Sequence, residues 1–247
     1  MIRGNLLGKR NYPDGVAARG VWSLQEQYHS SLATTWPPAS LVNTANLVLY
    51  LNAANSASYA GTGTQWTDLS GSGNHGTLIG SPTFTNGAFT FNGTNYVNCT
   101  TPRTADCTFS CWAKTTAALT QPMLFIAGPD GSGPDLFFYS GVISWNTWDG
   151  TAASFGAIPA TANNGAWHLY TVVNDQSVSN RARLYYDGTL LGDTTYKSAT
   201  GSTILRIGGS PSGYLWSGQI GLFTQNNTAL SAAQVLQNYN AQKSVFS

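Results

Sequence analysis

Short apolar runs separated by turn residues constrain the fold of this chain more than any other feature. From Leu47 onward these runs recur at the spacing of antiparallel sheets. No helix-length amphipathic segment separates them, which disfavours parallel sheets with crossover helices. The predicted strands are Leu47–Leu51, Phe89–Phe91, Tyr96–Val97, Thr108–Lys114, Met123–Ala127, Leu136–Tyr139, Val142–Thr147, Trp167–Val173, Arg183–Tyr186, Thr189–Leu191, Ile204–Ile207 and Gln219–Thr224.

Two local signals sharpen this picture. The pair Asp187-Gly188 supplies the positive φ angles that a two-residue hairpin needs, which predicts a hairpin between Arg183–Tyr186 and Thr189–Leu191. Ser231 and Gln234 have the spacing of a capping box ahead of an apolar stripe, which predicts one helix at the end of the domain.

The first forty residues differ from the remainder. They carry basic residues, a short helix candidate around Ser23 to Leu32, and the pair Pro37-Pro38, which can neither continue a helix nor donate to a strand ladder. We therefore predict an N-terminal anchoring arm over residues 1–40 and a β-sandwich domain over residues 41–247.

Composition restricts the partners that the chain can use. Charged residues make up only 9% of the chain and the formal net charge is +1, so a basic footprint for nucleic acid or an anionic membrane is missing. No window of about 18 apolar residues is present, and the start does not resemble a secretory signal, so we expect neither membrane insertion nor export by that route.

The cysteines Cys99, Cys107 and Cys111 form an odd set without the spacing of a metal site. We favour free thiols in a reducing compartment over the alternative, a Cys99–Cys107 disulfide.

Several motifs in order resemble the laminin-G-like branch of the concanavalin-type jelly-roll superfamily, over roughly Leu47 to Tyr239. The resemblance implies an all-β, two-sheet antiparallel jelly-roll sandwich with an extended N-terminal arm and a short C-terminal helix. The matching segments are Trp66–Gly76, Phe91–Gly93 leading to Tyr96-Val97, Phe109–Lys114, Trp167–Leu169, Leu184–Gly188, Ile207-Gly208 and Ala229–Val235.

The arm has a resemblance of its own, carried by Gly20–Tyr28 and Trp36-Pro37. It is similar to a short segment of bacteriophage virion proteins that precedes or joins accessory domains. The resemblance implies assembly in the host cytoplasm and localisation in the virion. A segment this short cannot bury its own aromatic residues, so we expect it to gain order by docking on its own sandwich or on a partner. Our hypothesis is that Trp22, Leu24, Tyr28 and Trp36 anchor the protein to other virion proteins or to sister subunits.

Catalytic chemistry finds little support. Some members of the superfamily hydrolyse polysaccharides with two carboxyl groups, yet the only glutamate here is Glu26 in the arm, and the aspartates show no alternation along one strand. Neither a nucleophile elbow nor clustered histidines are present: we expect His168 to be a packed, hydrogen-bonded residue and His75 to belong to a turn. The sequence predicts a non-enzymatic protein.

Calcium remains an alternative without specific support. Asp68, Asn74 and Asp193 could offer hard oxygen ligands from loops, but their spacing fixes no site. We favour turn-forming roles for them and predict no metal and no cofactor.

Carbohydrate binding would use exposed aromatic rings beside amide or carboxylate groups. Two clusters meet this description, although a core position remains the alternative for each ring. The candidate ligand-binding residues are Tyr139, Trp145, Trp148 and Asp149 in one cluster, with Asn146 beside them, and Tyr214 and Trp216 in the other.

The sequence thus predicts a phage virion accessory protein, either a head decoration or a tail or fibre component. It would form a homo-oligomer and display a lectin-like domain with a host-surface glycan as its candidate ligand. A free carbohydrate-binding lectin is the alternative, followed by a glycosidase.

Overall fold

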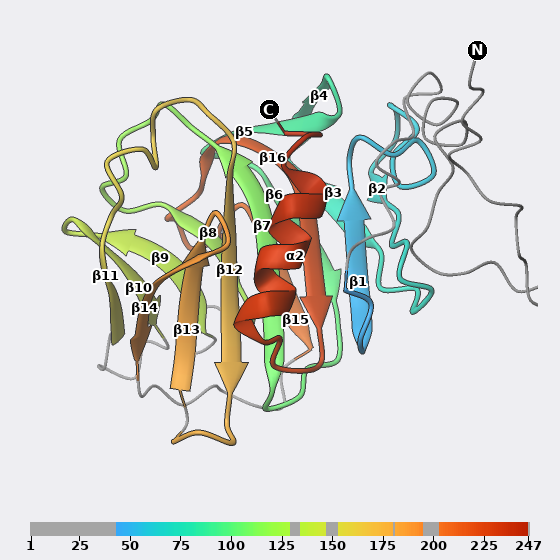
Figure 1. Ribbon diagram of the computed structural model, residues 1–247. Helices are drawn as coiled ribbons and strands as arrows, with labels where there is room; N and C mark the ends of the chain where they lie inside the picture. Colours follow the sequence, from blue (N-terminus) through green and yellow to red (C-terminus); the bar gives the residue numbers. More distant parts are fainter. Residues whose placement is uncertain (1–42, 129–133, 147–152, 180, 195–202, 247) are drawn as a thin grey trace, which may run out of the picture. The chain divides into compact units, whose positions relative to one another are not determined.

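The computed structural model describes residues 43–128, 134–146, 153–179, 181–194 and 203–246 (Figure 1). Residues 1–42 lie outside this part, so the anchoring arm and the boundary after Ser40 stay predictions. The described chain forms two antiparallel sheets of eight strands each and a helix, α2 (Ala232–Gln242). Among the described residues, no helix is long and apolar enough to cross a membrane.

The first sheet, sheet A, has the order β14-β13-β12-β7-β16-β5-β4, and β1 also pairs with β16. Its long central strands carry mostly buried residues. Its strands are β1 (Leu47–Asn52), β4 (Thr83–Thr85), β5 (Ala88–Asn92), β7 (Cys107–Lys114), β12 (His168–Asp175), β13 (Arg181–Tyr186), β14 (Thr189–Thr194) and β16 (Ser217–Asn226).

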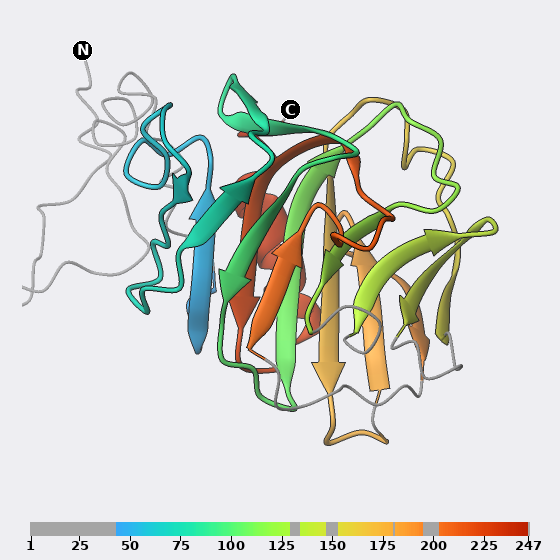
Figure 2. The same ribbon diagram turned by 180° about the vertical axis from the view of Figure 1, so that it is seen from behind.

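The second sheet, sheet B, lies behind the first and is seen from the other side in Figure 2. Its order is β11-β10-β9-β8-β15-β6-β3-β2. Its strands are β2 (Gln65–Trp66), β3 (Gly76–Ile79), β6 (Tyr96–Thr100), β8 (Met123–Ile126), β9 (Asp135–Tyr139), β10 (Val142–Asn146), β11 (Ala153–Ala157) and β15 (Ile204–Ile207).

The main core fills the space between the sheets because side chains alternate along each strand. On β9, Leu136 and Phe138 belong to this core. Phe137 and Tyr139 therefore point to the outer face of sheet B. Both sheets contribute large rings to the interior, among them Trp66, Phe89, Phe109, Phe125, Trp145, Trp216 and Phe223. The all-β, two-sheet jelly-roll prediction is confirmed.

The hairpin and the helix follow the local sequence signals. Asp187 and Gly188 have φ angles of 50° and 76°, as a two-residue hairpin with right-handed twist requires. Ser231 accepts from the backbone of Gln234, and the Gln234 side chain accepts from the backbone N–H of Ser231, which completes the predicted capping box. Figure 1 shows that α2 lies against the outer face of sheet A.

The edges of the two sheets meet where β14 passes β11. A Cβ atom at Gly192 would collide with the carbonyl group of Phe155, so only glycine allows this approach. β11 was missing from the predicted strands, as were β2, β3 and β4, because these strands are short and poor in apolar residues.

Candidate ligand-binding surface

Two of the predicted ligand-binding residues expose large aromatic rings. Tyr139 ends β9 and is 50% exposed, and Tyr214, in the loop between β15 and β16, is 38% exposed. The sequence assigned them to separate clusters. The structure brings them together through Phe137, which the sequence analysis missed.

Phe137 joins the two tyrosines into one aromatic surface. Its ring lies parallel to Tyr139, with 6.0 Å between centroids and 13° between planes. Tyr214 meets the same ring edge-on at 5.3 Å and 84°. We call Phe137, Tyr139 and Tyr214 the tyrosine platform. Strand alternation could have placed Phe137 on the face of Tyr139, whereas the contact with Tyr214 depends on the path of a distant loop.

A pocket of about 380 Å³ adjoins this platform at Tyr214. The loop between β7 and β8 forms one wall and the end of the β15–β16 loop forms the other, and Figure 2 shows both loops at the upper end of the sandwich. The lining residues are Ala117, Ala118, Leu119, Thr120, Gln121, Pro122, Tyr214, Leu215, Trp216 and Ser217. The pocket therefore combines apolar walls with hydroxyl and amide groups.

Backbone hydrogen bonds fix both walls to sheet B. Met123 donates its N–H to the carbonyl of Tyr214 at 2.8 Å, and Phe138 donates to the carbonyl of Pro122 at 3.0 Å. Thr115 also donates its hydroxyl to the carbonyl of Ser217. Because the walls are hydrogen-bonded to strands, the pocket is preformed, and binding a ligand would cost little conformational entropy.

Tyr214 holds a backbone conformation that side chains other than glycine rarely adopt. Its φ angle is 61°, and the preceding Gly213 has a φ of 114°. The left-handed region costs a bulky residue roughly 1 kcal/mol or more. Tertiary contacts hold this conformation: the ring of Tyr214 packs on Phe137, and its carbonyl accepts from the N–H of Met123.

Two of the other candidate rings belong to the core. Trp145 is fully buried against Phe109 and Phe125, and Trp216 is 1% exposed and packs on Phe138. Trp145 shares the inward face of β10 with Ile143, which explains its burial. The expectation of exposed rings is therefore wrong for both, and Trp145 lies in the core between the sheets. Trp216 is buried as well, but it still contributes to the lining of the pocket.

The remaining predicted residues lie outside the described ranges. These are Trp148 and Asp149 in the first cluster, and the arm residues Trp22, Leu24, Tyr28 and Trp36. Asn146 ends β10, and its side chain is likewise outside the described part.

The two histidines of the described part, His75 and His168, have the structural roles that the sequence predicted. His168 bonds through Nδ1 to Asp187 Oδ2 at 2.7 Å and through Nε2 to Asn164 Oδ1 at 3.2 Å, and its ring stacks on Tyr186. His75 accepts through Nδ1 from the backbone N–H of Asp68. Both rings therefore hold loops in place.

The three cysteines are buried free thiols, as the favoured interpretation predicted. Burial raises the pKa of Cys107 to about 12, and burial likewise raises the pKa values of Cys99 and Cys111. A nucleophilic cysteine needs a lowered pKa and access to solvent, so these thiols have the opposite properties.

Aspartates in the described part act as structural acceptors. Asp68 accepts from the backbone N–H groups of Tyr50, Ser70 and Asn74, all within 2.9 Å. Asp175 accepts from the hydroxyl of Ser177 and pairs with Arg183; these two contacts lower its pKa, the hydrogen bond from Ser177 contributing most.

Other acidic side chains show the same use. Asp106 accepts from the backbone of Gln176 at 2.7 Å, and Asp193 pairs with Arg181 at 3.2 Å. Asp130 and Asp149 lie outside the described residues.

The structure does not bring the calcium candidates together. Asp68 and Asn74 bind the backbone of β1, whereas Asp193 lies on β14 at the far edge of sheet A. Within the described ranges, no group of three or more His, Cys, Asp or Glu residues could hold a metal ion. Asp68 and Asn74 are used by the turn itself, in line with the turn-forming role. That role is wrong for Asp193, which lies within β14 and pairs with Arg181.

Comparison with known structures agrees with this architecture. The receptor-binding domain of botulinum neurotoxin type G superposes with a TM-score of 0.60 at 17% identity, over 80% of this chain and 52% of that chain. The binding domain of botulinum neurotoxin DC, solved in complex with SialylT, gives 0.61 at 12% identity, over 82% and 52%. The same domain, solved with rat synaptotagmin II, gives 0.59 at 12%, over 79% and 52%.

The chain thus spans about half the length of these structures, and identities this low establish the fold alone. A comparison with curated proteins found no significant match. The family model described as the concanavalin A-like lectin/glucanases superfamily matches residues 91–236, which is more than half of the chain. This protein therefore belongs to the concanavalin A-like lectin/glucanase superfamily, in its laminin-G-like branch.

Proposed function

We propose that this protein is a non-enzymatic glycan-binding module. The observation that carries the proposal is the tyrosine platform beside the preformed pocket. Exposed aromatic rings stack on the apolar faces of sugars, while nearby hydroxyl and amide groups pair with sugar hydroxyls. Tyr139 and Tyr214 supply the rings, and Thr120, Gln121 and Ser217 supply the polar groups.

The fold supports this proposal as an analogy. Binding domains with the same sandwich have been solved with SialylT and with rat synaptotagmin II. Fold alone does not determine function, so the argument rests on the platform and its pocket. The structural use of the described aspartates favours binding over hydrolysis.

We further propose that the module is displayed on a bacteriophage particle, as a head decoration or a tail or fibre component. The support is the resemblance of Gly20–Tyr28 and Trp36-Pro37 to a virion segment. In this proposal the protein assembles in the host cytoplasm as a homo-oligomer. Trp22, Leu24, Tyr28 and Trp36 attach it to other virion proteins, and the sandwich contacts a host-surface glycan.

Two measurements test these proposals separately. Incubation of the full chain with host-surface polysaccharide should retain the polysaccharide without releasing fragments, and released fragments would contradict a non-enzymatic role. Immunogold labelling of purified particles with an antibody against the sandwich should mark heads or tails. Glycan binding with unlabelled particles would favour a free lectin instead.

A further inference from the structure

We propose that the tyrosine platform and its pocket recognise an uncharged linear oligosaccharide rather than a sialylated or otherwise acidic one. The inference rests on the proposed glycan-binding function and adds the class of ligand. Three observations carry it: the charge of the lining, the arrangement of the exposed rings and the rigidity of the walls.

None of the described residues that line the pocket carries a charged side chain. Its polar side chains are those of Thr120, Gln121, Tyr214 and Ser217, all neutral hydrogen-bonding groups. Recognition of carboxylate or sulfate groups uses arginine or lysine, because a charge-assisted hydrogen bond is about twice as strong as a neutral one. A neutral lining therefore leaves an acidic sugar without a counter-charge and still pairs with ordinary sugar hydroxyls.

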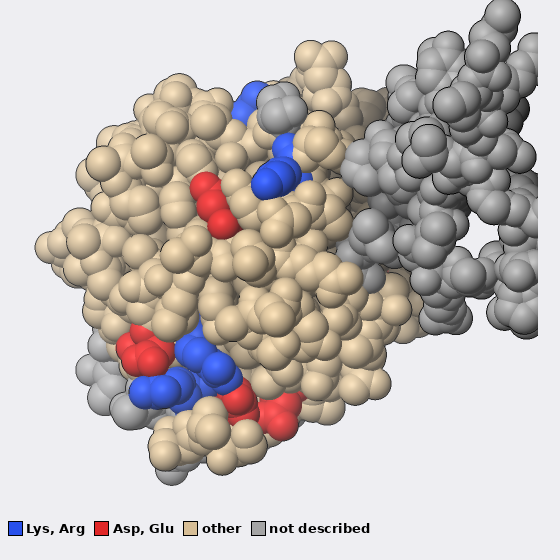
Figure 3. All heavy atoms as spheres, in the orientation of Figure 1, with Lys and Arg blue, Asp and Glu red and all other residues tan. Residues whose placement is uncertain are grey.

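None of the charged residues of the described part is among those that line the pocket. Arg181 and Arg183 pair with aspartates on sheet A, and Lys114 and Lys243 lie over aromatic rings beside α2. Figure 3, seen from the side of sheet A and α2, shows the lysine, arginine and aspartate side chains of that face in separate groups. Arg206 on β15 lies opposite Ile126 in the strand register of sheet B. Because Leu205 and Ile207 face the core, Arg206 is on the same outer face of the sheet as the platform, although it is not among the residues that line the pocket.

The exposed rings extend beyond a single sugar. Tyr139 and Tyr214 both contact Phe137, which is only 6% exposed, and their planes differ in direction because one is stacked and the other is edge-on. One sugar ring can cover one tyrosine face. Contact with both rings and with the pocket therefore requires several linked sugars, as in a linear glycan.

The rigidity of the site makes the ring geometry selective. Both pocket walls are bonded to β8 and β9, and Tyr214 is held in the left-handed conformation. A flexible surface could adapt to many ligands, whereas fixed rings select sugars whose apolar faces match their orientation.

A glycan array and titration calorimetry with the full chain test this inference. Neutral linear oligosaccharides should bind, with affinity rising from mono- to trisaccharide, and their sialylated or sulfated counterparts should bind at least tenfold more weakly. Tyr139→Ala and Tyr214→Gly should each weaken neutral binding about tenfold, as expected for one stacked ring. The glycine variant suits the positive φ of that position.

Leu190→Ala is the matched control, because Leu190 is 49% exposed and lies on β14 in the other sheet. The affinity of this variant for neutral oligosaccharides should be unchanged. Preferential binding of acidic glycans, or neutral binding that survives both tyrosine substitutions, would overturn this inference while leaving glycan binding intact. If no glycan of either class binds, the proposed function fails as well.

Discussion

The outer faces of the two sheets carry aromatic residues in opposite settings. On sheet A, Trp112 lies between the sheet and the C-terminal segment, where it stacks on Phe246 at 4.7 Å and on Tyr239 at 5.8 Å. On sheet B, Tyr139 and Tyr214 stay exposed around Phe137. The rings on sheet A are covered by the C-terminal segment, whereas Tyr139 and Tyr214 keep exposed ring surface.

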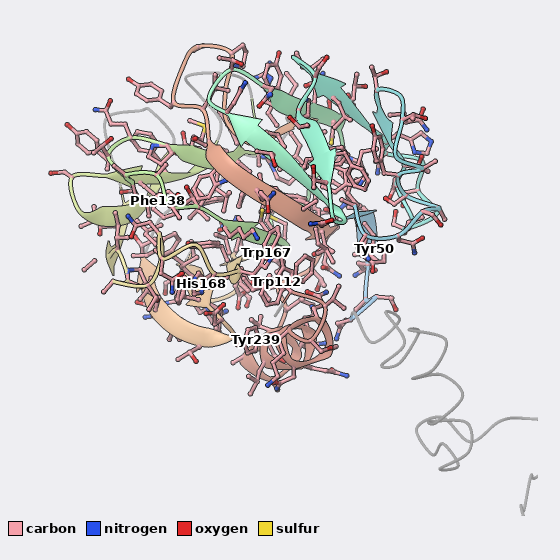
Figure 4. All side chains as sticks on the ribbon, turned by 90° about the horizontal axis from the view of Figure 1, so that it is seen from above. Tyr50, Trp112, Phe138, Trp167, His168 and Tyr239 are labelled. Carbon is pink, nitrogen blue, oxygen red and sulfur yellow. The ribbon has the colours of Figure 1, made fainter. Side chains whose placement is uncertain are left out.

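The covered rings on sheet A are also held by a side-chain hydrogen bond. The indole N–H of Trp112 donates to Gln242 Oε1 at 2.7 Å, so burial of this ring leaves no polar group unpaired. Trp167 meets Phe246 edge-on at 5.1 Å, and Figure 4 shows Trp112, Trp167 and Tyr239 grouped beside α2. The comparison teaches that aromatic residues on an outer face stabilise the fold where the C-terminal segment packs on them, and that residues of the same type can keep exposed surface on the other sheet.

The largest expected effect concerns the covered face. Trp112→Ala should lower the free energy of unfolding by about 3–5 kcal/mol, because it removes a buried ring and leaves a cavity under α2. Urea denaturation followed by circular dichroism measures this. Tyr139→Ala should change stability by no more than about 0.5 kcal/mol. If both variants lost the same free energy of unfolding, the distinction between the covered and the exposed face would be wrong.

A second prediction concerns the C-terminal end of the covered face. Phe246→Ala should cost about 2–4 kcal/mol, because this ring is 7% exposed and lies against Trp112, Trp167 and the backbone at Gly221. The neighbouring Val245→Ala is the control, because that side chain is 52% exposed and should cost about 0.5 kcal/mol or less. A negligible loss for Phe246→Ala would mean that the covered face does not depend on its C-terminal cover.

Alkaline pH should lower the free energy of unfolding, because the thiol of Cys107 is buried. Burial raises the pKa of Cys107 from 9.0 to about 12, so the folded state opposes loss of this proton. Its contribution to stability is complete below pH 9 and is lost as the pH rises from 9 toward 12. Denaturation at pH 7, 9 and 10.5 should show a falling midpoint, and Cys107→Ala should reduce the slope. An identical slope in the variant would contradict this role.

A smaller effect is expected at the exposed platform. Glycine normally destabilises a protein relative to alanine, but at φ 61° the order should reverse. Tyr214→Gly should therefore be more stable than Tyr214→Ala by about 1 kcal/mol. Paired denaturation curves measure the difference, and the usual order, alanine above glycine, would argue against the strained conformation.

The smallest predicted effect is that of a surface cation. Lys243 lies 5.5 Å from the ring of Tyr239 at the solvent edge of the covered face. Lys243→Ala should cost about 0.5 kcal/mol, because an exposed cation–π contact is weak. A loss as large as that of Phe246→Ala would show that charge, rather than ring packing, holds α2 in place.

The sequence predicted the parts of the fold that local rules determine. Apolar strand patterns, the Asp187-Gly188 hairpin and the Ser231 capping box all depend on neighbouring residues, and the structure confirms them. β11 escaped prediction because its sequence, Ala153–Ala157, is mostly small residues and its pairing depends on β10.

The candidate site was predicted only in part. Tyr139 and Tyr214 were named for their type, but only tertiary packing shows that they share Phe137. Trp145 could have been excluded from the sequence, because it alternates in phase with the apolar Ile143. The burial of Trp216 could not be predicted in this way, since this residue follows a loop whose course no periodic pattern fixes.

The central claim is that the exposed rings of sheet B bind glycan while the covered rings of sheet A hold the fold. Titration calorimetry of the Tyr139→Ala/Tyr214→Gly double variant, with a neutral trisaccharide that the unchanged protein binds, tests it most directly. The account predicts that affinity falls at least about 30-fold while the unfolding midpoint stays close to that of the unchanged protein. Unchanged affinity in a folded double variant would contradict it.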